Sequence, residues 1–255
     1  MIFEAGICVR RGKNKAECQD TALFGKEVLG ETLETLSCHS PAWIALLDGV
    51  GGNAGGREAS RYAASELASS EPASEAESVR SWIMAINRRL LAEAAPEKAQ
   101  MATTLAGVFF SGEDAFLVNA GNTRVYALQG PYLRQLTRDH TTRQMLLDMG
   151  NEEAARGCNA SEIMCCLGGG VPDYLDRLSV TKVFERNTPQ ILLMTTDGIH
   201  DVLTMDEMEL LLAGDGTLQE KAERLCLEAA NHGSEDDCSA ILVNLGQNSV
   251  TTDRR

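Results

Sequence analysis

The chain has 255 residues, of which 44% are hydrophobic and 24% charged, a composition typical of one globular domain and not of a disordered segment. It carries 37 Asp and Glu against 23 Lys and Arg, a formal charge of −14, which opposes a broad phosphate-binding surface and therefore a nucleic-acid partner. No apolar run approaches the ~20 residues of a membrane span, so we expect no membrane segment.

The first half of the chain predicts strands followed by a helical section. Val79, Trp82, Ile86 and Leu90 recur at three- and four-residue intervals, which is the stripe of a helix facing a core. The expected elements are a strand before a turn at 11–14, strands at 21–24 and 43–47, and helices at 57–69 and 75–94.

Turn signals divide the second half into short strands, beginning with Ser111-Gly112 and Gly121-Asn122. The stretch 141–176 is less regular, with one helix ending at Gly150, and is either a mobile segment over a site or a plain surface loop. The expected strands are 105–110, 115–120, 124–128, 132–136, 178–184, 191–195 and 239–245, with helices at 206–213 and 217–231.

Long runs of strands alternate with paired helices, and neither a repeat nor a change in composition marks an internal boundary. This order predicts an α+β fold in which two antiparallel β-sheets pack as a β-sandwich flanked by helix pairs. We expect one domain over residues 1–245, with a flap-like segment at about 141–176, and a flexible tail over 246–255.

Eight cysteines are spread along the chain without a C-x-x-C pair. Cys165 and Cys166 are adjacent and therefore hard to bridge to each other, and most of the others have apolar neighbours. The first residues do not resemble a secretory signal. We therefore expect free thiols and a cytoplasmic location.

Several apolar strands carry an aspartate at one end. Asp48 and Asp197 follow their strands, Asp236 and Asp237 precede the last strand, and Asp20 opens the second. Strand ends are rigid, and a following glycine lets the backbone bend and expose its carbonyl. If these ends converge, the carboxylates repel one another unless divalent cations hold them, and hard oxygen ligands select Mg²⁺ or Mn²⁺. An Asp-Gly pair is also an ordinary turn signal, and that interpretation stays open for each site.

Seven short motifs follow one another along the chain. They are Cys18-Gln-Asp20, Asp48-Gly-Val-Gly-Gly52, Ala102-Thr-Thr104, Gly121-Asn-Thr-Arg124, Leu136-Thr-Arg-Asp-His140, Thr196-Asp-Gly198 and Asp236-Asp-Cys-Ser239. In order and spacing, the chain resembles the type 2C metal-dependent serine/threonine protein phosphatases from about residue 4 to 245, in their short bacterial form. The resemblance implies a β-sandwich with a centre for two Mn²⁺ or Mg²⁺ ions at one end.

The resemblance also implies a role for each strand-end residue. Asp48 matches the carboxylate that bridges both ions, and the carbonyl of Gly49 matches a ligand of one of them. Asp197 and Asp236 match ligands of the other ion, and Asp20 matches the acidic residue that holds metal-bound water.

The chain departs from the family at the residue that holds the substrate phosphate. Relatives place an Arg five residues before the Asp20 position, and here that residue is Lys15. Lysine supplies the charge without the bidentate geometry of arginine, so we expect the phosphate to be held less tightly. Arg10 and Arg11 stay open as alternatives.

A second departure is Asn122, which stands where relatives carry an Asp that helps to bind a third, weaker cation. A neutral amide is a weaker ligand for a hard cation than a carboxylate, so a third ion is doubtful in this chain. Asp139 is the nearest motif carboxylate that could replace it. Asp139 and His140 also suit the cap of a helix that starts near Thr141.

Together these features predict an enzyme that hydrolyses phosphoserine and phosphothreonine in proteins with a water that bridges two Mn²⁺ or Mg²⁺ ions. Its catalytic residues would be Asp20, Asp48 and Lys15. We expect phosphorylated protein substrates, an opposing serine/threonine kinase and a monomeric enzyme. The alternative is a catalytically weakened relative that binds phosphoproteins or acts as a regulatory module. Calorimetric titration with Mn²⁺ separates the two, because a binding module has little reason to keep two tight metal sites.

Overall fold

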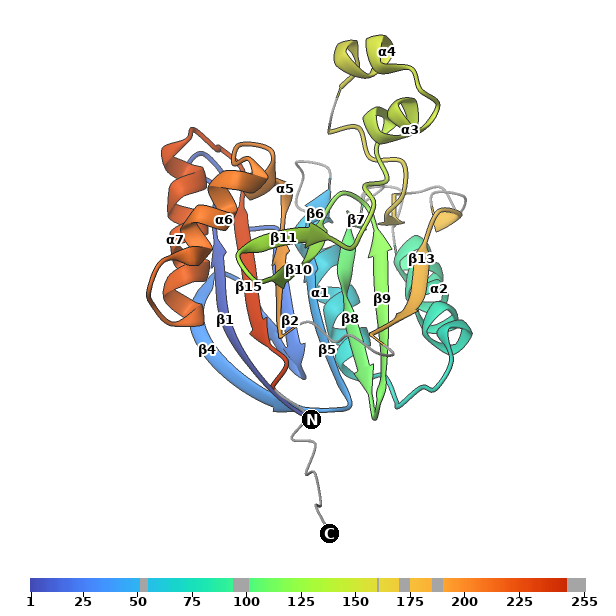
Figure 1. Ribbon diagram of the computed structural model, residues 1–255. Helices are drawn as coiled ribbons and strands as arrows, with labels where there is room; N and C mark the ends of the chain where they lie inside the picture. Colours follow the sequence, from blue (N-terminus) through green and yellow to red (C-terminus); the bar gives the residue numbers. More distant parts are fainter. Residues whose placement is uncertain (51–54, 94–100, 160, 170–174, 185–189, 247–255) are drawn as a thin grey trace.

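The fold is a sandwich of two antiparallel six-stranded sheets (Figure 1). The structure is a computed structural model, which describes residues 1–50, 55–93, 101–159, 161–169, 175–184 and 190–246. The first sheet has the order β11 (Tyr132–Gln135), β10 (Arg124–Gln129), β14 (Ile191–Thr195), β15 (Cys238–Asn244), β1 (Ile2–Arg10), β4 (Thr32–His39). The second has the order β13 (Ser179–Val183), β9 (Asp114–Ala120), β8 (Leu105–Ser111), β5 (Ala42–Leu47), β2 (Thr21–Gly25), β3 (Glu27–Leu29). Three short strands, β12 (Leu167–Gly168), β7 (Ala102–Thr103) and β6 (Gly49–Val50), form a further small sheet.

A pair of helices covers the outer face of each sheet (Figure 1). The second sheet packs against α1 (Gly55–Ala68) and α2 (Ala76–Glu93), and the first against α6 (Met205–Ala213) and α7 (Leu218–Asn231). The four-residue α5 (Asp197–His200) follows β14 directly. Two further helices, α3 (Thr142–Asp148) and α4 (Glu152–Gly157), extend beyond one end of the sandwich (Figure 1).

The alternation of side chains along β5 explains why the layers hold together. Trp43 and Leu47 face the core between the second sheet and its helices, whereas Ile44 and Leu46 face the core between the two sheets. All six residues of β5 are buried. Because successive side chains of a strand point to opposite faces, one short apolar segment contributes to two cores, and the aspartate that follows it is anchored firmly.

The predicted α+β sandwich with flanking helix pairs is therefore confirmed, and most predicted elements lie within two residues of the observed ones. The helix expected to end at Gly150 is α3, which ends at Asp148. The sequence pattern missed β3, β4, α4, α5 and the short strands β6, β7 and β12. All eight cysteines are free thiols, as expected. Most of the predicted tail, over 247–255, lies outside the described residues.

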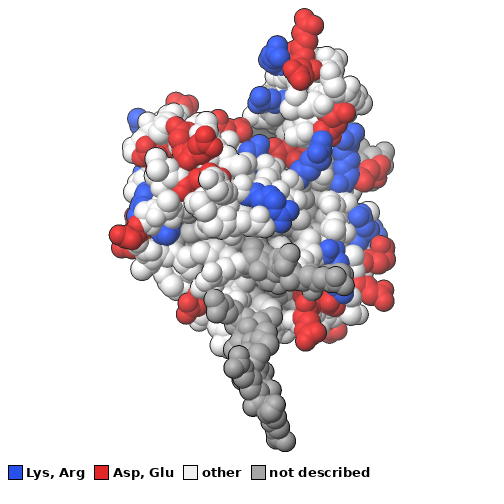
Figure 2. Space-filling view, viewed as in Figure 1, with Lys and Arg blue, Asp and Glu red and all other residues white. Residues whose placement is uncertain are grey.

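The surface charge and the helices are consistent with the two expectations drawn from the composition, that no broad basic surface and no membrane segment is present in the described part of the chain. Acidic and basic side chains are interspersed over the described part of the face drawn in Figure 2. Among the described residues, none of the helices combines the length and the apolar character that crossing a membrane requires.

Candidate metal centre

Asp48 follows β5, and two threonines fix its backbone. Its amide donates to Oγ1 of Thr104 at 2.9 Å, and its carbonyl accepts from the amide of Thr104 at 2.8 Å and from Oγ1 of Thr103 at 3.0 Å. Both threonines are buried. Because the backbone polar groups of Asp48 are paired here, the sandwich itself positions its carboxylate.

The glycines of the two Asp-Gly pairs allow close packing, and not the bend that the sequence suggested. Neither Gly49 nor Gly198 has a positive φ. A Cβ at Gly49 would lie 2.4 Å from the carbonyl carbon of Gly56, and a Cβ at Gly198 would lie 2.0 Å from the carbonyl oxygen of Asp237. A side chain at Gly49 would therefore push the end of β5 away from α1, and one at Gly198 would push α5 away from the residues before β15.

Asp20 directly precedes β2 and is 2% exposed. Its Oδ2 accepts from Oγ1 of Thr196 at 2.9 Å and from Oγ of Ser239 at 2.6 Å. Its Oδ1 is buried and has no hydrogen-bond partner in the described part of the chain. Burial, followed by repulsion from Asp237, raises the pKa of Asp20 to about 7. Thr196 and Ser239 are motif residues to which the sequence alone assigned no role, and they orient this carboxylate.

Asp197 is the first residue of α5, and Asn122 binds it from the β9–β10 turn. Nδ2 of Asn122 donates to Oδ2 of Asp197 at 2.9 Å. Burial, followed by repulsion from Asp236, raises the pKa of Asp197 to about 6, although the bond from Asn122 opposes this rise. Oδ1 of Asn122 is buried without a partner among the described residues.

The adjacent residues Asp236 and Asp237 have different surroundings. Asp236 is exposed, whereas Asp237 is 1% exposed. Asp237 accepts hydrogen bonds from the amides of Gly12 and Gln19, both at 2.8 Å, and so holds the loop between β1 and β2. The sequence did not predict this anchoring role. The available signal was that neighbouring residues of an extended segment point to opposite sides, so the two aspartates need not share one role.

Lys15 binds both of these aspartates. Its ammonium group forms an ion pair with Oδ1 of Asp236 and lies 3.2 Å from Oδ2 of Asp237. Burial disfavours the charged form, but the contacts with the two carboxylates outweigh it and raise the pKa of Lys15. Lys15 is thus a cation at the edge of the carboxylate cluster.

The two alternatives to Lys15 lie elsewhere. Arg10 is exposed at the end of β1. Nη1 of Arg11 donates to the carbonyl of Ala16 at 3.0 Å, and its Nε lies 3.8 Å from Oε2 of Glu31.

The four predicted aspartates come together. Burial, together with repulsion from Asp20, Asp197 and Asp236, raises the pKa of Asp48 well above its ordinary range, and Lys15 opposes this only in part. Among the described residues, no three carboxylate, thiolate or imidazole groups already form a closed ligand set. Crowded carboxylates with raised pKa values and the unpartnered oxygen of Asp20 nevertheless fit hard divalent cations, which would neutralise the repulsion. The donor set therefore suits Mg²⁺ or Mn²⁺.

The carboxylate of Asp139 forms an ion pair with Arg124 and does not cap a helix. Arg124 donates to it with Nε at 2.9 and 3.1 Å and with Nη2 at 2.5 Å. The expectation that Asp139 or His140 caps the following helix is wrong, because Thr141 is the N-cap of α3 and accepts from the amide of Gln144 at 3.2 Å. The short side chain of Thr141 reaches the first turn, whereas Asp139 is drawn to Arg124.

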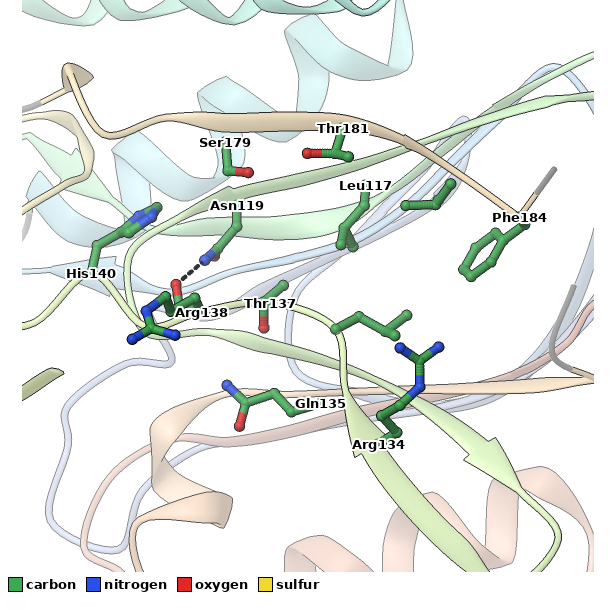
Figure 3. Close-up of a pocket in the computed structure, with 12 residues that line it drawn as sticks. Leu117, Asn119, Arg134, Gln135, Thr137, Arg138, His140, Ser179, Thr181 and Phe184 are labelled. Carbon is green, nitrogen blue, oxygen red and sulfur yellow. Dashed lines mark hydrogen bonds between the residues drawn. The ribbon is translucent and has the colours of Figure 1, made fainter. Parts of the chain in front are cut away.

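A cavity of about 550 Å³ lies away from the aspartates, at the open edge between β13 and β11 (Figure 3). It is lined by Leu117, Asn119, Arg134 and Thr181, among others. Nδ2 of Asn119 donates to the carbonyl of Arg138 at 2.6 Å. None of the candidate metal ligands lines this cavity, so it is separate from the carboxylate cluster.

Comparison with known proteins gives consistent matches. A family model described as Protein phosphatase 2C matches residues 13–225. The serine/threonine phosphatase stp of Listeria monocytogenes is 30% identical over 213 residues, covering 78% of this chain and 83% of that protein. The crystal structure of the Mycobacterium tuberculosis serine/threonine phosphatase PstP/Ppp is 25% identical, with a TM-score of 0.79, covering 97% of this chain and all of that chain. The PstP catalytic domain in complex with two manganese ions is 25% identical, with a TM-score of 0.75, covering 96% of this chain and 99% of that chain.

Proposed function

This chain belongs to the protein phosphatase 2C family, and we infer that it is a metal-dependent protein phosphatase that hydrolyses phosphoserine and phosphothreonine. The convergence of Asp20, Asp48, Asp197 and Asp236 is the observation that carries this inference. Hydrogen bonds from Gly49 to Gln19, and from Thr196 and Ser239 to Asp20, bring these segments together. These carboxylates come from separate strand ends, repel one another, and need divalent cations to be compatible.

We assign the ligand roles on the same basis. Asp48 would bridge two Mn²⁺ or Mg²⁺ ions, with the carbonyl of Gly49 on one of them. Asp197 and Asp236 would bind the other, and Asp20 would hold water through the oxygen that has no partner among the described residues. Two such cations supply an activated water and stabilise the charge that develops during in-line displacement at phosphorus.

Lys15 is proposed to hold the substrate phosphate. It is already paired with carboxylates at the edge of the cluster, so its ammonium group lies where an anionic ligand would approach. A lysine binds phosphate as a point charge, without the two parallel hydrogen bonds of an arginine.

The biological setting is also part of the proposal. Substrates are phosphorylated proteins, and a serine/threonine kinase opposes the enzyme, which acts as a cytoplasmic monomer. Residues 1–245 form one domain, with the segment at about 141–176 as a flap. The position of α3 and α4 beyond the end of the sandwich supports a flap, because these helices make few contacts with the sheets (Figure 1).

The direct test is hydrolysis of an aryl phosphate by the Mn²⁺-loaded protein. We expect turnover that a chelator abolishes and that Asp48→Asn reduces by several orders of magnitude, whereas the exposed control Asp215→Asn keeps it. Calorimetric titration should show two tight Mn²⁺ sites in the wild type and their loss in Asp48→Asn. A metal-loaded protein without turnover on aryl phosphates or phosphopeptides would overturn the proposal and favour a phosphoprotein-binding module.

A further inference from the structure

A second cavity, of about 440 Å³, opens beside the carboxylate cluster. It lies between the loop after β1, the turn after β3 and the first turns of α1. Three arginines line it in a protein whose net charge is −14. Its charged lining residues are Arg11, Arg57, Arg61, Glu17, Glu31 and Asp20.

Two of the arginines come from one face of α1. Arg57 and Arg61 are four residues apart, which brings side chains of a helix together on one side. Nη1 of Arg57 donates to Oε2 of Glu17 at 2.8 Å, but both side chains are partly exposed, at 44% and 36%. Exposed pairs of this kind are weak, so an incoming anion can replace the glutamate.

The guanidinium of Arg61 has no hydrogen-bond or ion-pair partner among the described residues, and the residue is exposed. Its Nη1 would lie 3.9 Å from a Cβ built at Gly30, which places the guanidinium across the cavity from α1. A guanidinium without a protein partner at a cavity wall can bind a carboxylate or a phosphate with two parallel hydrogen bonds.

Asp20 connects this cavity to the reaction centre. It lines the cavity, and the carbonyl of the preceding Gln19 accepts at 3.2 Å from the amide of Gly49, which directly follows Asp48. An anion held here is therefore close to the phosphate undergoing hydrolysis. Apart from Asp20, to which the proposed function assigns the metal-bound water, the charged lining is three arginines against two glutamates.

We propose that this cavity is a second anion subsite, in which Arg57 and Arg61 bind an acidic side chain or a second phosphate next to the phosphoserine or phosphothreonine that is hydrolysed. The proposal rests on the proposed function and adds a substrate class to it. Arg57 and Arg61 act here as specificity residues that touch the substrate away from the reacting atoms.

The test uses synthetic phosphopeptides with the Mn²⁺-loaded protein. One phosphothreonine is flanked by neutral residues, and a single Glu or a single nonhydrolysable phosphonate is then moved through the neighbouring positions on each side. At one or two of these positions we expect kcat/KM to rise about tenfold through a lower KM. A tenfold change is what one additional charge-assisted hydrogen bond contributes to binding. The Glu and phosphonate series distinguish an acidic residue from a second phosphate as the preferred anion.

Variants assign the effect to the arginines. Arg57→Gln with Arg61→Gln should bring the ratio of kcat/KM for anionic and neutral peptides close to one, and Arg61→Lys should retain part of it. Arg134→Gln, which removes an exposed arginine on β11, should leave the ratio as in the wild type. Binding of the same labelled peptides, followed by fluorescence anisotropy, gives a readout independent of turnover.

The outcomes separate the two proposals. If aryl phosphate is hydrolysed but no anion position changes kcat/KM or binding, the subsite is wrong and the proposed function stands. If the preference exists but survives both substitutions, the anion binds elsewhere and the subsite is also overturned. If nothing is hydrolysed but anisotropy shows an arginine-dependent preference, the subsite stands and the proposed function fails.

Discussion

Nδ2 of Asn122 donates a hydrogen bond to Oδ2 of Asp197 across 2.9 Å, so an uncharged amide binds a carboxylate of the candidate metal centre. This bond stabilises the ionised form of Asp197 in the absence of a cation. It adds no negative charge to the site, and the nearby Asp139 is already paired with Arg124. We therefore expect two ions at this centre and no third one at moderate metal concentration.

Asn122→Asp is predicted to have opposite effects on stability and on activity. The second carboxylate beside Asp197 removes a hydrogen-bond donor and adds repulsion, which should lower the free energy of unfolding of the metal-free protein by about 1–3 kcal/mol. The same carboxylate should let a weaker additional cation bind and raise turnover at moderate Mn²⁺. Denaturant titration and turnover as a function of Mn²⁺ check both effects. If turnover and its metal dependence are unchanged, the assignment of Asn122 to a third-ion position is wrong.

Metal removal should make stability depend on pH in a definite direction. The pKa values of Asp20 and Asp197 rise on folding to about 7 and about 6, so between about pH 4 and pH 7 the folded state binds more protons than the unfolded state. The free energy of unfolding of the chelated protein should therefore fall as the pH rises through this window, by up to about 1.4 kcal/mol per pH unit for each group.

Thermal unfolding of the chelated protein at pH 4.5 to 7.5 measures this dependence, with Asp20→Asn as the matched variant. The stability of Asp20→Asn relative to the wild type should increase with pH, and added Mn²⁺ should raise the wild-type Tm more at pH 7.5 than at pH 5. A difference between variant and wild type that stays constant over the whole range would contradict the prediction.

The adjacent aspartates should give different phenotypes. Asp237→Ala leaves the amides of Gly12 and Gln19 without their acceptor and should lower the free energy of unfolding by about 2–3 kcal/mol. Asp236→Asn changes an exposed residue, so it should weaken Mn²⁺ binding while stability without metal stays nearly constant. Calorimetric Mn²⁺ titration and urea unfolding of both variants distinguish the two roles. Equal losses of stability in the two variants would show that both aspartates are structural.

Thr104→Val should disturb the metal centre through the backbone. The substitution removes the acceptor for the amide of Asp48 and the hydroxyl that lies 2.6 Å from Oγ1 of Thr123. Leaving buried polar groups unpaired costs about 1–3 kcal/mol, and a displaced Asp48 should also lower kcat. Thr181→Val on the exposed edge strand β13 is the control and should change neither quantity. A normal kcat in Thr104→Val would mean that the threonine does not position the carboxylate.

The pattern of side chains predicted the inner elements well, because that information is local. In β5 and β15 every residue or nearly every residue is buried, and the helical stripe from Val79 to Leu90 faces the core. The strands β3 and β4 were not predicted, because they form sheet edges and their side chains are at least partly exposed. An exposed edge strand does not need the apolar alternation by which a strand is recognised.

The sandwich and the set of aspartates are predictable from the sequence, because buried strands need apolar residues and an aspartate next to such a strand is placed by the strand end. The partner of each polar side chain depends on the folded arrangement. Asp139 pairs with Arg124, Lys15 with Asp236 and Asp237, and Asp237 with the loop before β2. Charged and hydrogen-bonding groups take the partners that folding brings within about 3 Å, and those partners are often far away in the sequence. The distribution of apolar residues therefore predicts the framework, whereas the role of each carboxylate depends on which strand ends and loops the framework brings together.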